Sequence, residues 1–212
     1  MVTYLRNGIG TAATSGFIPN GIEGHTGQQG YTYNIEKAKK HLKRYQMETG
    51  NQFPEVTLAT VSDYVSLCEF IQRELQKIGI KINVEVLPAP TLRKQKNTGK
   101  LELFRASWIA DYPDAENFML PYHSSNFSPN GPNYTHFKNS TFDQLYEQSF
   151  LIPNIEERKL LYQKMDSIVI EEAPIIPLYY DEFVRFTQSN ISGIPKNAQN
   201  FLFLKTAKKA KK

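Results

Sequence analysis

The chain has 212 residues, of which 40% are apolar and 22% are charged. This composition excludes a disordered or fibrous chain, and the length suits one or two domains with a buried core. The formal net charge of +4 comes from five lysines in the last eight residues, and residues 1–204 alone carry a net charge of −1. We therefore expect a nearly neutral body, a basic disordered tail at 205–212, and no binding of nucleic acid.

The first half of the chain predicts one parallel strand pair. Residues 1–33 are rich in glycine and should be a loop-rich segment, and a helix should follow from the N-cap residue Asn34 to Gly50. A strand at 55–61, a helix at 64–78 capped by Ser62 or Asp63, and a strand at 80–87 then follow with short links. This order is typical of a strand–helix–strand unit with parallel strands.

The second half predicts further helices and strands, and the whole indicates an α/β fold. Asp114 and its neighbours should open a short helix that starts at Pro113, and a long polar and aromatic loop should cover 121–139. The other expected elements are helices at 91–97, 140–150 and 154–172, strands at 101–108, 175–180 and 183–187, and an apolar stretch at 201–204. The second and third of these helices should each open with a capping box, at Ser140–Asp143 and at Asn154–Glu157.

Three groups of residues are candidates for chemistry. The acidic residues Asp111, Asp114 and Glu116 could form a catalytic carboxylate pair, cap a helix or bind a ligand. The four histidines have no metal-ligand spacing, so we expect no metal site. Cys68 falls on the apolar face of a helix and should be a core residue rather than a nucleophile. The sequence contains neither a nucleophile-elbow motif nor a phosphate-binding loop motif.

The strongest candidate site lies at the end of the strand expected at 101–108. Arg105, Trp108 and Asp111 place a cation, an aromatic wall and an anion within seven residues. Ligands of open α/β sheets bind outside the carboxyl ends of the strands, so this set suits a zwitterion. The alternative is that Trp108 belongs to the core and Arg105 is a surface residue.

The same segment, F-R-A-S-W-I-A-D-Y-P-D-A-E-N-F, resembles the signature of the extracytoplasmic solute-binding proteins of dipeptide and oligopeptide ABC transporters. Other segments agree with that family in order: G-F-I-P-N-G at 16–21, Y-N-I-E-K-A-K-K-H-L at 33–42, F-I-Q-R-E-L-Q-K-I-G-I-K-I-N-V at 70–84, F-K-N-S-T-F-D-Q-L at 137–145, E-E-R-K-L-L-Y at 156–162 and E-E-A-P-I-I-P-L-Y at 171–179. The resemblance covers nearly all of this chain but only the C-terminal part of the family.

The resemblance implies the C-terminal lobe of a periplasmic-binding-protein-like (type II) fold, with a parallel or mixed sheet flanked by helices. Residues 1–33 would be an interlobe or cleft segment, and residues 34–204 would be the α/β ligand-binding lobe. By resemblance, Asp111 meets the α-ammonium of the ligand, Trp108 lines the cleft and Arg105 meets the ligand's carboxylate. Tyr112 and Tyr134 complete the expected ligand-binding set. A lobe without its partner should also expose an aromatic, partly apolar face around Trp108, Tyr112 and Tyr134.

The implied function is the capture of peptides and their delivery to an ABC permease through closure of two lobes, without catalysis or a cofactor. The expected partners are a peptide, the permease subunits and the missing N-terminal lobe of the same protein, without a direct membrane span. The parent protein should be periplasmic or membrane-anchored as an extracytoplasmic lipoprotein, although no signal peptide is visible in this chain. The alternative function is a carboxylate-dependent hydrolase that uses Asp111 and Asp114.

Overall fold

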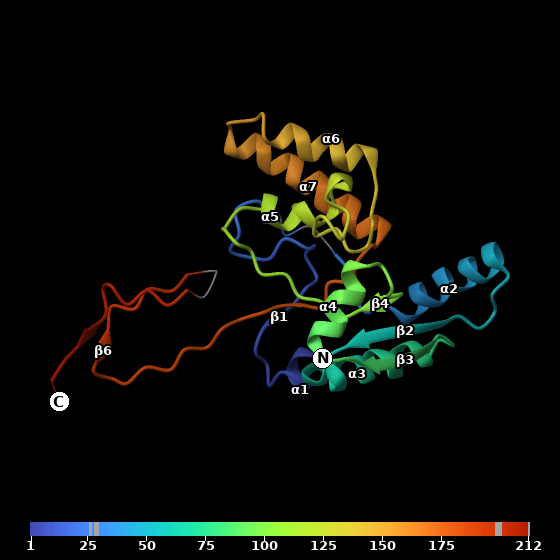
Figure 1. The fold of residues 1–212 in the computed structure, drawn as a ribbon, viewed down its shortest axis with the longest axis horizontal. Helices are drawn as coiled ribbons and strands as arrows, with labels where there is room; N and C mark the ends of the chain where they lie inside the picture. The colour runs from blue at the N-terminus through green and yellow to red at the C-terminus, as the bar shows by residue number, and fades with distance from the viewer. Residues whose placement is uncertain (26, 28–29, 198–200, 212) are drawn as a thin grey trace.

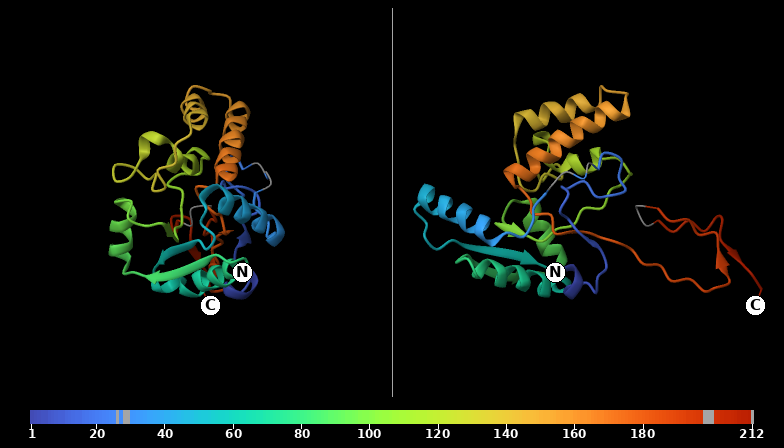
Figure 2. Two further views of the ribbon diagram at one scale, coloured as in Figure 1. Left: turned by 90° about the vertical axis from the view of Figure 1, so that its right-hand side faces the viewer. Right: turned by 180° about the vertical axis from the view of Figure 1, so that it is seen from behind.

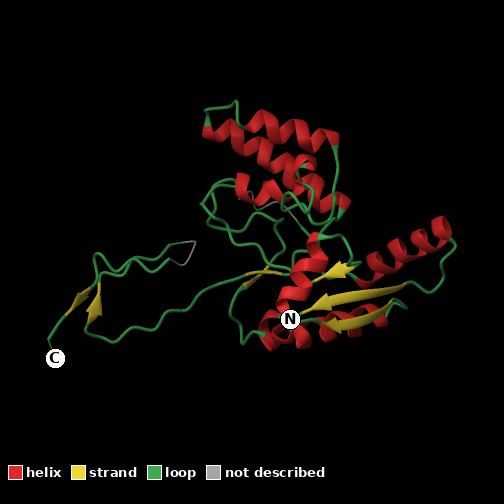
Figure 3. Cartoon of the chain, viewed as in Figure 1, coloured by secondary structure: helices red, strands yellow, loops and turns green. Residues whose placement is uncertain are grey.

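The computed structural model describes residues 1–25, 27, 30–197 and 201–211. The chain forms an α/β body from which a long C-terminal arm extends (Figure 1). Within the body, a three-stranded sheet lies at one end and helices α5 (Glu116–Met119), α6 (Ser140–Ser149) and α7 (Ile155–Glu172) lie at the other. The distribution of helices and strands can be followed in Figure 3.

The sheet contains the predicted parallel unit. Strand β2 (Glu55–Thr60) lies between β3 (Lys81–Val86) and β4 (Leu103–Phe104), and it pairs in parallel with both. Helix α3 (Val65–Gln76) connects β2 to β3 and buries Cys68 against Leu58 and Ile82, because its apolar residues recur at helical spacing. The strand–helix–strand prediction and the core position of Cys68 are therefore confirmed.

The two ends of helix α2 (Ile35–Thr49) are confirmed, whereas the start of α3 differs from the prediction. The Oδ1 atom of Asn34 accepts a hydrogen bond from the amide of Lys37 at 2.8 Å, and Gly50 ends α2 in the left-handed region with φ of 73°. Helix α3 instead follows a 3₁₀ turn, η1 (Ser62–Tyr64), and neither helix start receives a side-chain cap. Helix α4 (Ala89–Asn97) begins two residues earlier than expected.

The helical end of the body has its own core. Phe142 on α6, Met165 and Val169 on α7 and Ile18 from the N-terminal segment are completely buried there. Asn154 caps α7 as predicted. Helix α6 is capped by Asn139 rather than Ser140. The Asp143 carboxylate that the expected capping box would use accepts hydrogen bonds from Ser124 instead.

The strand expected at 101–108 is much shorter in the structure. Strand β4 covers only Leu103–Phe104, and the amide of Arg105 still donates to the carbonyl of Ala59 at 2.9 Å. Beyond Arg105 the chain crosses to the helical end, where Trp108 packs against the second core. The apolar surface available to Trp108 is on that core and not on the sheet, which explains why the strand stops early.

The N-terminal segment pairs with the part of the chain that follows α7. It contains helix α1 (Val2–Leu5) and strand β1 (Thr11–Ala12), and β1 pairs in the antiparallel sense with β5 (Tyr179–Tyr180). The strand expected at 175–180 is thus reduced to its last two residues. Through β1 and the buried Ile18, the loop-rich segment forms part of the body.

The C-terminal arm, residues 183–197 and 201–211, extends away from the body (Figure 2). The strand expected at 183–187 is absent, and the side chain of Phe186 is 93% exposed. Near its end the arm holds a small antiparallel pair, β6 (Ile191–Ser192) and β7 (Lys208–Lys209), so the expected disordered tail contains paired residues. A strand needs a neighbour to satisfy its backbone, and the apolar residues at 183–186 have none in the described chain.

Candidate functional site

Asn117 on helix α5 holds two of the predicted site residues in a fixed relation. Its Oδ1 atom accepts hydrogen bonds from Trp108 Nε1 and from the backbone amide of Asp111, both at 3.2 Å. Asn117 is only 1% exposed, whereas Asp111 lies at the surface. The Trp108 ring packs on the helical core, so one buried amide fixes the backbone of Asp111, whose side chain is exposed, relative to the Trp108 indole.

Glu116 anchors the third predicted residue, Tyr112. The hydroxyl groups of Tyr112 and of Tyr146 on α6 both donate hydrogen bonds to the buried Glu116 carboxylate. Burial and this bond to Glu116 raise the pKa of the Tyr112 hydroxyl, so Tyr112 remains a neutral donor. Glu116 therefore connects the 108–112 turn to α6, which is a structural role.

Asp114 has the capping role that the sequence offered as one of three possibilities. One carboxylate oxygen accepts from the amide of Glu116 at 2.9 Å, and the other binds the guanidinium of Arg158 on α7 at 2.8 Å. Helix α5 thus begins after Asp114 rather than at Pro113. Because both oxygens of Asp114 are engaged, the arrangement does not resemble a pair of catalytic carboxylates around one ligand.

Arg105 lies in a different contact group from Trp108 and Asp111. Its guanidinium carbon is 3.2 Å from the ring centroid of Tyr64, and its N–H groups donate to Ser107 Oγ at 3.4 Å and to the Tyr179 hydroxyl at 3.5 Å. Arg105 is partly buried, and no carboxylate of the described residues lies within ion-pair distance of it. The Arg105 guanidinium can therefore offer a positive charge to an external anion.

Tyr134 is the predicted residue that the structure does not bring to this group. The ammonium of Lys96 on α4 lies 3.9 Å from the centroid of the Tyr134 ring. Burial lowers the pKa of Lys96, and the nearby Arg93 adds to this effect. Within the described residues, no hydrogen bond or ring contact joins Tyr134 to Trp108, Asp111 or Arg105.

Sequence reasoning missed Asn117 and the two tyrosines around Arg105, and it did not predict the structural role of Glu116, which it considered among the acidic residues. A sequence signal existed for Asn117 and Glu116, because E-N-F-M places two polar residues in one turn with two apolar residues, and the structure buries all four. A buried polar side chain must be hydrogen-bonded, so such residues often organise a site. Tyr64 and Tyr179 gave no comparable signal, because they are far from Arg105 in the sequence.

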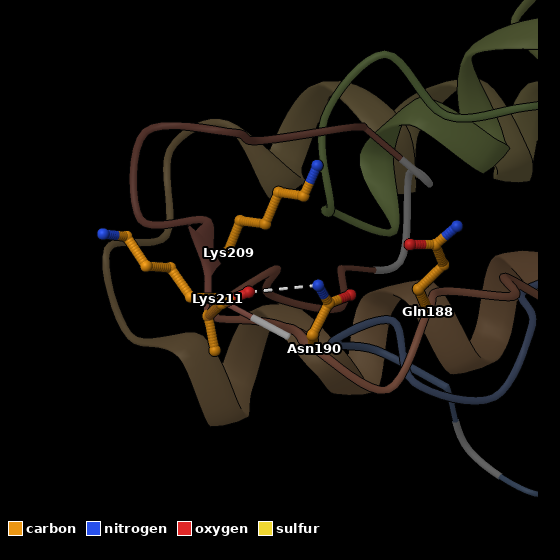
Figure 4. A pocket seen from close by; sticks show the side chains of 5 residues that line it. Gln188, Asn190, Lys209 and Lys211 are labelled. Atoms are coloured by element: carbon orange, nitrogen blue, oxygen red, sulfur yellow. Dashed lines mark hydrogen bonds between the residues drawn. The ribbon is translucent and has the colours of Figure 1, made fainter.

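The histidines and the arm offer no competing site. His25, His123 and His136 make local hydrogen bonds to Ile18, Ser125 and Ser128, and no three metal-ligating side chains gather in the described residues. Figure 4 shows a hollow on the arm, where Asn190 donates to the carbonyl of Ala210 at 3.1 Å. The hollow is lined by Gln188, Asn190, Lys209, Ala210 and Lys211. None of these is a predicted site residue.

Residues 1–130 match the family model described as "Bacterial extracellular solute-binding proteins, family 5 Middle", and the chain belongs to this family. It is 31% identical over 182 residues to heme-binding protein A of Haemophilus influenzae, an alignment that covers 84% of this chain and 33% of that protein. It is 26% identical over 180 residues to dipeptide-binding protein DppE of Bacillus subtilis, which covers 83% of this chain and 32% of the relative.

The fold is also similar to solved structures. The periplasmic binding protein DppA of Helicobacter pylori, in complex with the peptide STSA, matches with a TM-score of 0.81 and 25% identity, over 99% of this chain and 41% of DppA. HbpA2 of Haemophilus parasuis matches with a TM-score of 0.82 and 22% identity, over 99% of this chain and 42% of HbpA2. The chain thus spans less than half the length of each of these relatives.

These similarities confirm the family resemblance and the α/β fold class predicted from the sequence. They also confirm the expectation of a binding protein rather than an enzyme, because the family binds solutes. The family is extracellular, which agrees with the expected location outside the cytoplasm. Separately, none of the helices in the described residues is long and apolar enough to cross a membrane.

Proposed function

We propose that this chain is the ligand-capture lobe of a peptide-binding protein that delivers oligopeptides to an ABC permease. The ligand is trapped when a further lobe closes on this one, as in other binding proteins with a hinge. The names of several relatives support a peptide: DppE binds dipeptides, two Pseudomonas aeruginosa relatives bind di- and tripeptides, and DppA holds the peptide STSA. Others are named for heme, glutathione or deoxycholate, so the residues of this chain must carry the argument.

The observation that carries the proposal is the Trp108–Asn117–Asp111 arrangement. A peptide of any sequence has an ammonium at one end and a carboxylate at the other, and both are costly to desolvate without a partner. Asp111, placed by Asn117 beside the Trp108 ring, supplies the anion for the ammonium through a charge-assisted hydrogen bond. Arg105 supplies the cation for the carboxylate, and Tyr112 extends the aromatic surface.

The exposed arm supports the two-lobe part of the proposal. Its apolar side chains are exposed by half or more: Phe183, Val184, Phe186, Phe201, Leu202, Phe203 and Leu204. A set of this kind is typical of a surface that another part of a protein covers. In our proposal the missing N-terminal lobe covers it, residues 1–33 border the cleft and residues 34–204 supply the ligand-binding lobe. The protein then works outside the cytoplasmic membrane, in the periplasm or on a lipid anchor.

Substitution of Asp111 tests the ammonium assignment in the protein that carries this chain together with the closing lobe. Asp111→Asn preserves the shape of the side chain but removes its charge, and loss of the partner of a buried ammonium costs about 3–5 kcal/mol. The expected loss of affinity for a free peptide is two to three decades or more. An N-acetylated peptide should bind the unmodified protein poorly and should lose little more with the substitution.

Asp114→Asn is the matched control, because Asp114 binds Glu116 and Arg158 inside the protein and should not contact the ligand. It should leave the peptide affinity nearly unchanged. Equal affinity of the unmodified protein for free and acetylated peptides, with Asp111→Asn neutral, would show that Asp111 only supports the local turn.

A further inference from the structure

Helix α2 concentrates positive charge in a body that is otherwise slightly acidic. Residues 33–53 contain five lysine and arginine side chains and two glutamates, a net charge of +3, whereas residues 1–204 as a whole carry −1. All five cations lie on α2, between Lys37 and Arg44. A local concentration of one sign of charge creates a surface potential that attracts anions.

The cations of α2 lie on its exposed side. Lys37, Lys40 and Arg44 recur at spacings of three and four residues, so they share one face of the helix. These three side chains line a shallow hollow together with their neighbours Asn34, Glu36 and His41. The other side of the helix carries its partly buried apolar residues: Ile35, Ala38 and Leu42. The name basic face is used below for the surface formed by Lys37, Lys40, Lys43 and Arg44.

Most of this positive charge is not neutralised within the protein. Lys39 forms an ion pair with Glu36 at 2.9 Å, and Arg44 forms one with Glu48 at 2.7 Å. Both pairs are exposed, so they hold their cations only weakly. The other lysines of α2 are exposed and have no carboxylate within ion-pair distance in the described chain: Lys37, Lys40 and Lys43. The basic face is therefore suited to an external surface that carries many negative charges.

Two exposed apolar side chains lie at the end of the same helix. Met47 in the last turn of α2 is 77% exposed, and Phe53 in the loop after it is 86% exposed. The loop is tied back to the helix, because Gln46 Nε2 donates to the carbonyl of Gln52 at 2.8 Å. Met47 gains nothing from a phosphate group, whereas apolar side chains beside lysines fit the boundary between the headgroups and the acyl chains of a bilayer. This combination favours a membrane over a soluble polyanion.

The basic face is also accessible when the other proposed contacts are made. Helix α2 projects from the body on the side opposite the C-terminal arm, so a lobe that covers the arm leaves α2 exposed (Figure 1). The last turn of α2 leads to the start of β2, whereas the candidate site follows the end of β4. Because β2 and β4 are parallel, these positions lie at opposite ends of the sheet. Contact with a surface at Met47 and Phe53 therefore leaves the candidate site uncovered.

We propose that the basic face of α2, together with Met47 and Phe53, docks on a membrane that contains anionic phospholipids. The lysines contact the lipid phosphates, and the two apolar side chains enter the headgroup region. The family is extracellular, and outside the cytoplasm a membrane is the extended anionic surface nearest to a transporter. The contact is reversible and concentrates the protein at the membrane. It does not depend on which solute the protein binds.

Vesicle flotation with the 212-residue chain tests this inference. The chain is mixed with vesicles of phosphatidylglycerol and phosphatidylcholine, or of phosphatidylcholine alone, and the bound fraction is measured as the lipid concentration rises. Each basic residue near an anionic membrane strengthens binding by about fivefold. Lys37→Gln, Lys40→Gln and Lys43→Gln together should therefore weaken binding to the anionic vesicles by about a hundredfold. Sodium chloride should weaken the binding of the unmodified chain, because salt screens exposed charges.

The lysines of the tail provide the matched control. Lys208→Gln, Lys209→Gln and Lys211→Gln remove the same charge from another exposed segment, and this variant should bind like the unmodified chain. Met47→Ser with Phe53→Ser should weaken binding by about tenfold and preserve its salt dependence, because it removes only apolar contacts. All the substituted side chains are exposed, so the variants should fold, and circular dichroism checks this.

Four results would overturn the inference. Equal losses in the two lysine variants would show that only net charge matters. Equal binding of the unmodified chain to both kinds of vesicle would assign the contact to the apolar arm. Binding to heparin that depends on the lysines of α2, without binding to anionic vesicles, would assign the basic face to a soluble polyanion. Loss of vesicle binding in the protein that carries this chain together with the closing lobe would show that the lobe covers α2.

Discussion

Asp166 provides the sharpest prediction for the stability of this protein. It lies on helix α7, is 1% exposed, and its Oδ1 atom accepts a hydrogen bond from the amide of Phe17 at 2.8 Å. Its Oδ2 atom makes no hydrogen bond in the described part of the chain. Burial raises the pKa of Asp166 to about 6, although the amides of Phe17 and Ile18 and the nearby His25 oppose the shift.

The direction of the pH effect follows from this shift. The folded protein binds the Asp166 proton more tightly than the unfolded chain does, where the pKa is about 4. The group therefore favours folding at low pH, and this contribution is lost as the pH rises from about 4 through about 6. A shift of about two units corresponds to about 3 kcal/mol in full, of which about 2.5 kcal/mol falls between pH 4 and pH 8.

Asp166→Asn removes the titration but keeps an acceptor for the amide of Phe17. Its buried NH2 group costs a further amount that does not depend on pH, so the difference between variant and parent is the quantity to compare. Relative to the parent, the variant should gain about 2.5 kcal/mol of unfolding free energy between pH 4 and pH 8. Urea unfolding, followed by circular dichroism at several pH values, measures this difference.

Asp114→Asn serves as the control, because Asp114 is partly exposed and paired with Arg158. It should not reproduce the gain at high pH. A stability difference between Asp166→Asn and the parent that stays constant from pH 4 to pH 8 would refute the reasoning, because it would mean that Asp166 titrates alike in the folded and unfolded chains.

Three further predictions concern the N-terminal loop, the arm and the affinity of the isolated chain. Gly16→Ala should destabilise the protein by about 1 kcal/mol or more beyond Gly21→Ala. Both glycines have positive φ, but only at Gly16 would a Cβ atom meet Asp166, at 2.1 Å, and urea unfolding that gives equal losses would contradict this. The chain should self-associate through its arm in light scattering, and Phe186→Ser with Phe203→Ser should reduce this; a monomeric parent at high concentration would count against it. Calorimetry on the 212-residue chain should find no peptide binding tighter than about millimolar, since the loss of about 4 kcal/mol of contacts moves a micromolar site there; micromolar binding would contradict the two-lobe proposal.

The exposed apolar surface is one feature on which the structure differs from the expectation drawn from the sequence. From the sequence we expected exposed aromatic residues around Trp108, Tyr112 and Tyr134, but Trp108 and Tyr134 are partly buried. Seven large exposed apolar side chains, including Phe186, lie on the arm, whereas Ile109 and Tyr112 are the exposed ones beside Trp108. Apolar content alone does not show whether a segment finds a core, which explains the difference.

The sequence by itself determined the local elements whose cause is local. Asn34 and Asn154 cap their helices because an amide oxygen accepts the free N–H groups of the first turn. The helical spacing around Cys68 and the alternation at 80–86 determined the parallel pair, because each period buries one face. The segment from Arg105 to Asp111 was found for a similar reason, since its residue types lie close together in the chain.

Only the tertiary structure decided how those residues are held. Strand β4 ends at Phe104 because Trp108 finds its apolar neighbours on the helical core. Asn117 becomes the link between Trp108 and Asp111 only when α5 is buried. Tyr179 reaches Arg105 because β5 pairs with β1, a contact between segments far apart in the chain. Such contacts depend on which surfaces the folded chain brings together, and no local pattern of residues encodes them.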